Sequence, residues 1–274
     1  MNTWNEEHNL PWSLGSVQSW ADEIVVVDMH SQDRTREVAE SYGAKVYLHE
    51  WLGFSEPARA FAVAQAQGEF VLLLDADEMI PEPLSRALRQ LADEGQFDIA
   101  NVARSNYMFG ERLEHTGWGA HQDRHLRFFR RGSLNTSATI HKFLHPAEGA
   151  RIQQLKADPD LCIVHFNYND VVQFIDKLNR YTTVEAKQAK ERGQTETGWA
   201  TTRHVLGELF RRYVKKGGYR DGWRGFYLSL LMALYRVGTA AKLAELNAGM
   251  GAEAARARYR EIAEDVLRGY ANEE

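Results

Sequence analysis

The stretch FVLLLDADEMIPE, residues 70–82, runs through five apolar residues and stops at two aspartates one residue apart. A continuous apolar run of this length predicts a β-strand that is buried on both faces. Asp75 and Asp77 then lie at the carboxyl end of that strand. Paired carboxylates directly after a buried strand indicate a functional site at this edge of a sheet.

Segments typical of strands and of helices alternate around this stretch. The sequence predicts strands at 24–28, 44–49 and 70–75, and helices at 9–20, 33–42, 56–67 and from about residue 81 onward. Because the strands are continuous apolar runs, we expect an α/β fold with a Rossmann-like, mostly parallel sheet and helices on both faces. Open sheets of this kind bind ligands beyond the carboxyl ends of their strands. Asp28 and Asp75, which each end a strand, are therefore expected at the binding crevice.

The pattern changes from about residue 98 onward. Shorter mixed segments there predict additional strands and long loops, and helices are expected at 171–192, 203–246 and 252–270. The glycine-rich stretch 217–225, GGYRDGWRG, is expected to form a loop or hinge between helices. We expect a catalytic domain over 1–200, with a donor half at about 1–97 and an acceptor half at about 98–200. A helical, basic and aromatic region follows over 201–274.

Composition excludes several classes of protein. Cys162 is the only cysteine among 274 residues, so no intramolecular disulfide can form and a reducing compartment is expected. The first residues show no secretory signal pattern. The most apolar stretch, 225–238, is shorter than the roughly 20 residues that span a bilayer. These observations favour a cytoplasmic protein, with the inner face of the cytoplasmic membrane as a second location.

The two aspartates of the opening stretch suit a divalent cation. Mg²⁺ and Mn²⁺ prefer carboxylate oxygens and keep positions open for phosphate. Asp75 and Asp77 at positions i and i+2 of a tight turn could therefore hold one ion, which would bridge the protein to a diphosphate. In the alternative interpretation, Asp75 and Asp77 only solvate the strand end and begin a turn, and Asp77 and Glu78 favour the start of the next helix.

Several stretches in order resemble the family 2 glycosyltransferases of the GT-A fold, closest to bacterial enzymes that build lipopolysaccharide cores and other envelope glycans. The stretches are NTWNEEHNLPWSL (2–14), ADEIVVVDMHSQDRTREVAESYGAKVY (21–47), GFSEPARAFAVAQAQGEFVLLLDADEMIPEPL (53–84), GWGAHQDRHLRFFRRG (117–132) and GGYRDGWRGFYLSLLMALY (217–235). Together they extend over nearly the whole chain. The resemblance implies transfer of a sugar from a nucleotide-sugar donor, with inversion at the anomeric carbon.

The resemblance also implies roles for residues of the first half. It places Thr3, Asn5 and Glu7 beside the nucleoside base, Asp28 on the pyrimidine, Arg59 near the base or diphosphate, and Asp75 and Ala76 at the donor, with Asp75 and Asp77 as metal ligands. UDP is the nucleotide that the resemblance favours, with other nucleoside diphosphates left open. Each assignment has a simpler alternative: the acidic residues after Trp4 could lead into a helix, Asp28 could form a turn, and Arg59 could pair with Glu56.

An inverting transfer needs a general base that accepts the proton of the acceptor hydroxyl. In the resembling family this base is a carboxylate on the acceptor side, and GWGAHQDRHLRFFRR matches its motif, so Asp123 is the candidate. Alternatively, Asp123 could form an ion pair with Arg124 or Arg127 in a surface loop. His141 and His165 are conceivable third metal ligands, but neither belongs to a zinc-motif spacing, and we assign neither to the metal.

The C-terminal region is basic and aromatic. Residues 203–242 contain nine Lys/Arg and two acidic residues, although the whole chain carries a net charge of −5. The stretch 210–236 places these charges beside Tyr, Trp, Phe and an apolar segment, as in a segment that lies on an anionic membrane. A lipid-linked saccharide acceptor would make such contact useful. In the alternative, the apolar face packs on the catalytic domain and the charges are solvated.

The sequence departs from the family at its beginning. The related enzymes have an apolar strand before the Asn-Thr-Trp-like segment, whereas here the first residues are Met1, Asn2 and Thr3. An interior strand of a parallel sheet bonds to neighbours on both sides, so its loss would leave backbone groups unmatched. We therefore expect the first strand to be missing and hypothesise a truncated start.

Two other functions compete with glycosyl transfer. A sugar nucleotidyltransferase also uses a carboxylate-bound metal, but it usually has a glycine-rich phosphate loop near its start, and NTWNEEHNL contains no glycine. A non-catalytic or truncated relative that binds a sugar or lipid is the other alternative. Nucleic acid is not an expected partner, because the carboxylates would then have no role. The donor sugar, the acceptor, the linkage and the oligomeric state do not follow from the sequence.

Overall fold

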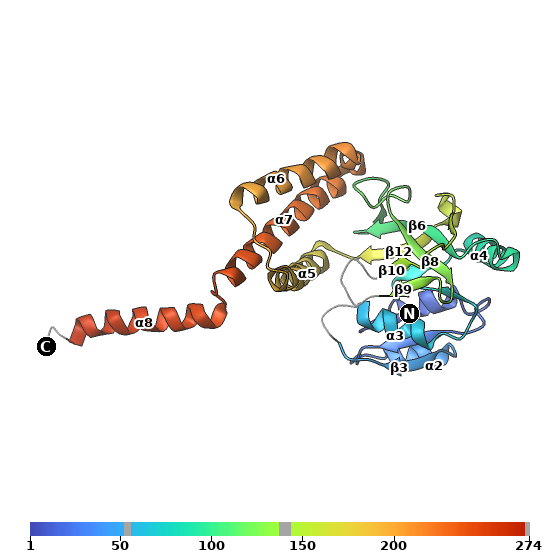
Figure 1. Ribbon diagram of the computed structural model, residues 1–274, viewed down its shortest axis with the longest axis horizontal. Helices are drawn as coiled ribbons and strands as arrows, with labels where there is room; N and C mark the ends of the chain where they lie inside the picture. Colours follow the sequence, from blue (N-terminus) through green and yellow to red (C-terminus); the bar gives the residue numbers. More distant parts are fainter. Residues whose placement is uncertain (52–55, 137–143, 272–274) are drawn as a thin grey trace. The chain divides into compact units, whose positions relative to one another are not determined.

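The structure, a computed structural model, describes residues 1–51, 56–136 and 144–271 (Figure 1). The strands are β1 (Asn2–Thr3), β2 (Val25–Asp28), β3 (Lys45–Leu48), β4 (Phe70–Leu72), β5 (Glu78–Met79), β6 (Ile99–Met108), β7 (Glu111–Arg112), β8 (Arg124–Arg130), β9 (Leu134–Thr136), β10 (Leu144–Pro146), β11 (Ile152–Gln154) and β12 (Ile163–Tyr168). The α-helices are α1 (Leu10–Gly15), α2 (Thr35–Ser41), α3 (Glu56–Gln65), α4 (Glu82–Glu94), α5 (Val171–Glu191), α6 (Gly198–Leu209), α7 (Gly222–Asn247) and α8 (Ala252–Ala271).

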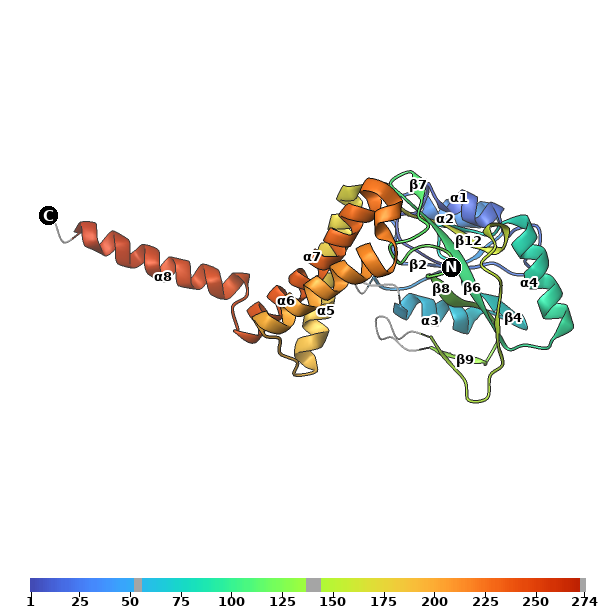
Figure 2. The ribbon, with the colours of Figure 1, turned by 90° about the horizontal axis from the view of Figure 1, so that it is seen from above.

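The first half has the predicted α/β architecture. β1, β2 and β3 form a parallel sheet in the order β1-β2-β3. Val26 of β2 packs with residues of α1 and α2, whereas its neighbour Val27 packs with Ala58 and Ala62 of α3. Figure 2 accordingly shows α1 and α2 on one side of the strands and α3 on the other. The alternation of side chains along a strand explains why β2 must be apolar on both faces.

The second sheet is mixed and not mainly parallel. Its strands follow the order β4-β8-β6-β12-β5, with β7 and β11 also paired to β6. β8 runs antiparallel to both β4 and β6, whereas β12 runs parallel to β6. This sheet brings the end of β4, the start of β8 and the first half of β12 together. The α/β class predicted from the sequence is confirmed, and the mixed pairing belongs to the later, shorter segments.

A cavity lies between β2 and β4, where the family's first strand, expected to be missing here, would be placed. β1 has only two residues and pairs with Val27 and Asp28, the last two residues of β2. Beyond β1, a cavity of about 330 Å³ lies between the start of β2 and β4, lined among others by Val25 and residues 70–74. The N–H of Leu73 donates to Arg127 of β8, so the backbone groups of Phe70 and Leu72 point towards the cavity side.

The chain divides into two compact units, which we describe separately. Unit 1 consists of residues 1–174 together with 212–227 and contains all the strands of the described residues. Unit 2 consists of 175–211 and 228–274 and is helical. Among the described residues, no helix combines the length and the apolar character that a membrane crossing requires. The domain limits expected from the sequence, at 97/98 and 200/201, stay a prediction.

Candidate active site

The site is built around the turn that follows β4. The N–H of Glu78 donates to the carbonyl of Asp75 (3.1 Å), and the N–H of Asp75 donates to the Glu78 carboxylate (2.9 Å). β5 starts at Glu78 and pairs with β12, and the N–H of Phe166 donates to the carbonyl of Asp77 (2.9 Å). The turn is therefore anchored on two strands, and it holds the side chains of Asp75 and Asp77 in place.

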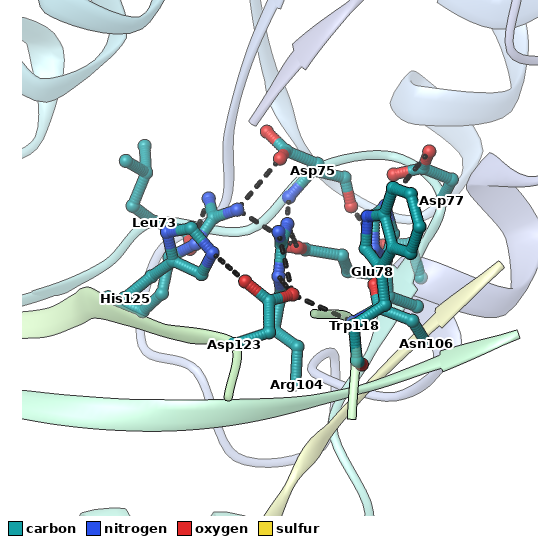
Figure 3. Close-up of polar contacts among 12 residues, drawn as sticks. Leu73, Asp75, Asp77, Glu78, Arg104, Asn106, Trp118, Asp123 and His125 are labelled. Atoms are coloured by element: carbon teal, nitrogen blue, oxygen red, sulfur yellow. Dashed lines mark hydrogen bonds and ion pairs between the residues drawn. The ribbon is translucent and has the colours of Figure 1, made fainter. Parts of the chain in front are cut away.

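Two arginines pair with the carboxylates of the turn: Arg127, which is buried, and Arg104, which is largely buried and is labelled in Figure 3. Arg127 Nη2 is 2.9 Å from both Asp75 Oδ2 and Glu78 Oε1, and Arg104 Nη1 is 3.1 Å from Glu78 Oε1. The side chain of Glu78 is fully buried, and a charge so far from water is tolerated only when it is paired. From the sequence, Glu78 was predicted only to favour the start of the following helix, Arg104 had no predicted role, and Arg127 was predicted only as an alternative partner of Asp123.

Asp75 is held between two cations. Arg59 Nη2 donates to Asp75 Oδ1 at 2.5 Å, and Arg127 contacts the other carboxylate oxygen. Burial opposes the charge of Asp75, but Arg127 and Arg59 outweigh it and hold the pKa of this carboxyl well below its usual range. Arg59 thus contacts Asp75. The side chain of Glu56, its alternative partner, lies outside the described residues.

Asp77 faces His165 of β12, with 3.5 Å between Asp77 Oδ2 and His165 Nε2. Asn106 fixes the imidazole: its Nδ2 lies 2.7 Å from the Trp118 carbonyl and 2.7 Å from Asp123, so its Oδ1 is the atom that accepts from His165 Nδ1 (2.6 Å). In neutral His165 the unprotonated Nε2 then faces a carboxylate. Two acceptor atoms at this separation form a suitable pair for a cation.

The donor set fits a divalent cation in part. Two ligands of one octahedral ion, each at about 2.1 Å from it, lie about 3 Å apart, close to the separation of the Asp77 and His165 atoms. No group of three His, Cys, Asp or Glu residues within the described ranges is arranged to hold a metal. Asp75 is engaged by Arg59 and Arg127. His141, the other histidine considered, lies outside the described residues.

Asp123 lies at the start of β8 and accepts four hydrogen bonds or ion pairs. Its Oδ2 is 3.0 Å from both Nε and Nη2 of Arg104 and 2.7 Å from Asn106 Nδ2, and its Oδ1 is 2.8 Å from His125 Nε2. Burial would raise the pKa of Asp123, but these donors, His125 first, bring it below the usual range. The alternative partners, Arg124 and Arg127, instead contact the Leu155 carbonyl and Asp75.

The loop before Asp123 is fixed by a distant segment of unit 1. Asp221 accepts hydrogen bonds from the N–H groups of Glu114 and His115 (both 3.2 Å) and from Thr116 Oγ1 (2.5 Å). Arg212 donates to the Thr116 carbonyl and lies 4.4 Å from the centre of the Trp118 ring. The loop that leads to Asp123 therefore depends on residues about 100 positions away.

Within 217–225, Gly218 and Gly225 allow the backbone to pack closely, and Gly217 and Gly222 have positive φ angles. Residues 218–221 form a 3₁₀-helix and α7 begins at Gly222, which corrects the expectation of a loop over the whole stretch. A Cβ on Gly225 would come within 1.9 Å of the Gly218 carbonyl oxygen, so only glycine allows this approach.

The predicted base-binding residues lie at the carboxyl ends of β1 and β2 and in the loops that follow these strands. Asp28 is fully buried and accepts from the N–H and hydroxyl of Ser31 (2.9 and 2.5 Å) and from Thr3 Oγ1 (3.3 Å). Asn5, in the loop after β1, accepts through Oδ1 from the N–H of Gln32 in the loop after β2 (2.8 Å). These contacts join the carboxyl ends of β1 and β2, where an open sheet binds its ligand.

The two remaining predicted donor residues, Glu7 and Ala76, lie in different surroundings. Glu7 accepts from the N–H of Arg34 (3.0 Å) and belongs to the same loops. Ala76 is buried in the apolar cluster with Leu10 and Leu14, so its side chain points into the core. Trp4 and Trp51 stack at 4.9 Å near these loops, a pair to which the sequence analysis gave no role.

The first half of the chain matches a known family. The model of glycosyl transferase family 2 matches residues 1–148, which is more than half of the chain. The chain belongs to glycosyl transferase family 2. The protein is therefore a glycosyltransferase, as the sequence motifs indicated. The turn at Asp75 and the loop at Asp123 both lie inside the matched region.

The similarity to other glycosyltransferases extends beyond residues 1–148. A lipopolysaccharide core biosynthesis glycosyltransferase of Rhizobium meliloti, LpsC, is 28% identical over 252 residues, covering 89% of this chain and 90% of that protein. An uncharacterised glycosyltransferase of Rickettsia typhi is 24% identical over 262 residues, with 89% and 85% covered.

Solved structures of glycosyltransferases also resemble this chain. The mannosyltransferase PcManGT of Pyrobaculum calidifontis, in complex with GDP-Man and Mn²⁺, is 16% identical with a TM-score of 0.49, covering 88% of this chain and 85% of that one. TarS of S. aureus in complex with UDP-GlcNAc is 15% identical with a TM-score of 0.46, covering 92% and 91%.

Proposed function

We propose that this glycosyltransferase transfers a sugar, with inversion, from a nucleoside diphosphate sugar, with UDP-sugar as the first candidate. The acceptor is a saccharide or a lipid-linked saccharide of cell-envelope glycan or lipopolysaccharide biosynthesis. The relative named for lipopolysaccharide core biosynthesis, covered over 90% of its length, supports this class of acceptor.

One observation carries the proposal: a single polar network joins the turn after β4 to the candidate base. Asp75 contacts Arg127, Arg127 and Arg104 both contact Glu78, and Arg104 contacts Asp123. A transferase needs cationic groups for the leaving diphosphate and a carboxylate for the acceptor hydroxyl within one site. The non-catalytic alternative would not require this connection.

The donor would bind at the carboxyl ends of β1, β2 and β4. The loops that hold Thr3, Asn5, Glu7 and Asp28 would receive the nucleoside, and the stacked Trp4 and Trp51 offer an aromatic face to a base or a sugar ring. Arg59, which is partly exposed beside Asp75, would meet the diphosphate.

A divalent cation would be held by Asp77 and His165, with Asp75 as a further ligand if it exchanges an arginine contact. Such a cation supplies charge stabilisation for the diphosphate leaving group. This chain's own residues would do the rest: Asn106 keeps the tautomer of His165, and Arg59 and Arg127 offset the remaining negative charge.

Asp123 would accept the proton of the attacking hydroxyl. Its lowered pKa keeps the carboxylate ionised at neutral pH, which is the form that a general base needs. Arg104, Asn106 and His125 hold it in position. Asn106 also donates to the carbonyl of Trp118, in the loop that Asp221 fixes.

Nucleotide binding tests the proposed donor site. In calorimetric titrations of the purified protein, we expect UDP to bind in the presence of Mn²⁺ and at least about tenfold more weakly without it, because the cation bridges protein and diphosphate. GDP serves as the competing nucleotide, and uridine, which lacks the diphosphate, as the control that should show no Mn²⁺ effect. Absence of binding by both UDP and GDP would contradict the donor site and favour a non-catalytic relative.

We further propose that the segment 212–227 of unit 1 contacts an anionic membrane. Its exposed side chains include Val214, Tyr219, Trp223, Phe226 and Tyr227, next to the exposed Arg220. Arg224 stacks on Trp223 and donates to the Phe109 carbonyl, so this aromatic surface is attached to the catalytic unit. Aromatic and basic side chains on one surface suit the interface of an anionic bilayer.

Vesicle binding tests this surface. We expect Arg220→Glu to lower partition onto vesicles that contain phosphatidylglycerol by about thirtyfold, since it loses one attraction and gains one repulsion of about 1 kcal/mol each. Arg86→Glu, on the exposed face of α4, is the matched control and should leave partition unchanged. Equal partition of both variants and of the unsubstituted protein would contradict a membrane role for this segment.

A further inference from the structure

Helix α8 carries an exposed apolar stripe with the spacing of a helix seam. Ala255, Tyr259, Ile262 and Val266 follow one another at intervals of four, three and four residues. This alternation places them on one line of a helix, as in the a and d positions of a coiled coil. Tyr259, Ile262 and Val266 are 68%, 47% and 58% exposed.

An uncovered stripe of this kind calls for a partner helix. α8 is 20 residues long, and isolated helices of this length gain most of their stability from packing of an apolar face. Tyr, Ile and Val are also weak helix formers at exposed positions, so packing would explain their presence here.

The charges of α8 are separated along the helix. Residues 252–260 contain Arg256, Arg258 and Arg260 against Glu253, whereas residues 261–271 contain Glu261, Glu264 and Asp265 against Arg268. The two ends follow the helix dipole, with Glu253 in the first turn and Arg268 in the last. The interior does not, since it places the basic residues before the acidic ones. The helix therefore has a basic half and an acidic half with no net charge.

Contacts within the helix do not account for this separation. Arg258 pairs with Glu261 at 2.9 Å and Arg268 pairs with Asp265, and both pairs are well exposed. Exposed pairs of this kind contribute little, and an arginine ahead of its acidic partner is the less favourable order in a helix. Zero net charge also argues against an anionic membrane as the partner of this helix.

We propose that α8 pairs antiparallel with α8 of a second copy of this chain. With Tyr259 facing Ile262 of the second copy, Val266 faces Ala255 of the second copy. In this register each apolar side chain of the stripe packs on an apolar side chain of a different size from the second copy. Arg258 flanks this seam on one side and comes next to Asp265 of the second copy, and the symmetric pair repeats the contact.

Charge selects the antiparallel orientation. It sets the basic half of one helix against the acidic half of the other, whereas a parallel pair would bring the two basic halves together. The helix is about 30 Å long and the stripe from Ala255 to Val266 only about 17 Å, so the interface lies at the small end for specific complexes. We expect a dimer that dissociates at about micromolar concentration.

Sedimentation equilibrium of the full chain, with exchanged charges, tests the pairing. Arg258→Asp and Asp265→Arg should each weaken the dimer about tenfold, because each substitution sets two like-charged pairs against each other. An equimolar mixture of the two variants should recover the original affinity, since every pair across the mixed dimer is again of opposite charge. Arg260→Asp, on the outer side of the same helix, should change little.

Three results would overturn the proposal. A chain that stays monomeric at all concentrations would show that α8 packs on its own unit. A dimer that resists both single substitutions would use another surface. Vesicle binding that Ile262→Asp removes, without any dimer, would make a membrane the partner. Circular dichroism of each variant separates loss of pairing from loss of helix.

Discussion

Replacing Asp77 by asparagine is expected to abolish sugar transfer while the protein remains folded. The change keeps the size of the side chain and removes the charge that would hold the cation beside His165. Because a bound cation contributes several kcal/mol to a transition state with developing negative charge, turnover should fall by about a thousandfold or more. The measurement is the release of nucleoside diphosphate from the donor identified by titration, with Mn²⁺ present.

The fold should survive this substitution for a structural reason. The Asp77 side chain is 22% exposed, and the contact that anchors the turn to Phe166 comes from the Asp77 backbone carbonyl. Thermal unfolding should therefore shift little. Asp176→Asn, an exposed aspartate on α5, is the matched control and should keep full turnover. Turnover by the Asp77→Asn variant at the original rate would refute the cation site, and loss of both turnover and folding would assign Asp77 a structural role.

The local pattern predicted the first half of the fold because its signals are local. Continuous apolar runs fixed the strands around Val26 and Val71, and their polar ends located Asp28 and Asp75 at one edge. The predicted strand at 70–75 is shorter in the structure: β4 ends at Leu72, and the turn closed by Asp75 and Glu78 follows two residues later.

The polar network could not be predicted because its members come from distant segments. Arg104 and Arg127 lie 26 and 49 residues from Glu78, and a shift of one residue in β6 or β8 would turn each side chain to the other face. The sequence shows only arginines in strands. An arginine within a predicted strand was the available signal, and it did not identify a partner.

Replacing Asp123 by asparagine is expected to lower kcat by about a hundredfold to ten-thousandfold, the usual contribution of a general base. Asparagine can keep the hydrogen bond from Arg104 but cannot take up the proton of an acceptor hydroxyl. Donor binding should persist, because Asp75 pairs with Arg59 and Arg127 and Asp77 lies beside His165, whereas Asp123 pairs with Arg104. Calorimetry with UDP and Mn²⁺ on the same variant checks that separation.

His125 provides the sharper comparison, since it is the other group in this pair able to accept a proton. Burial lowers the pKa of His125 below its ordinary value of 6.5, more than its hydrogen bond to Asp123 raises it. If Asp123 is the base, its lowered pKa leaves it ionised from pH 8 down to about 5, the ordinary aspartate value being about 3.9, so kcat/KM should stay flat. His125→Gln should then retain most of its activity. A fall in kcat/KM of the unsubstituted protein below pH 6.5, together with loss of turnover in His125→Gln, would instead make the imidazole the proton acceptor. Asp123 would then be the residue that orients it.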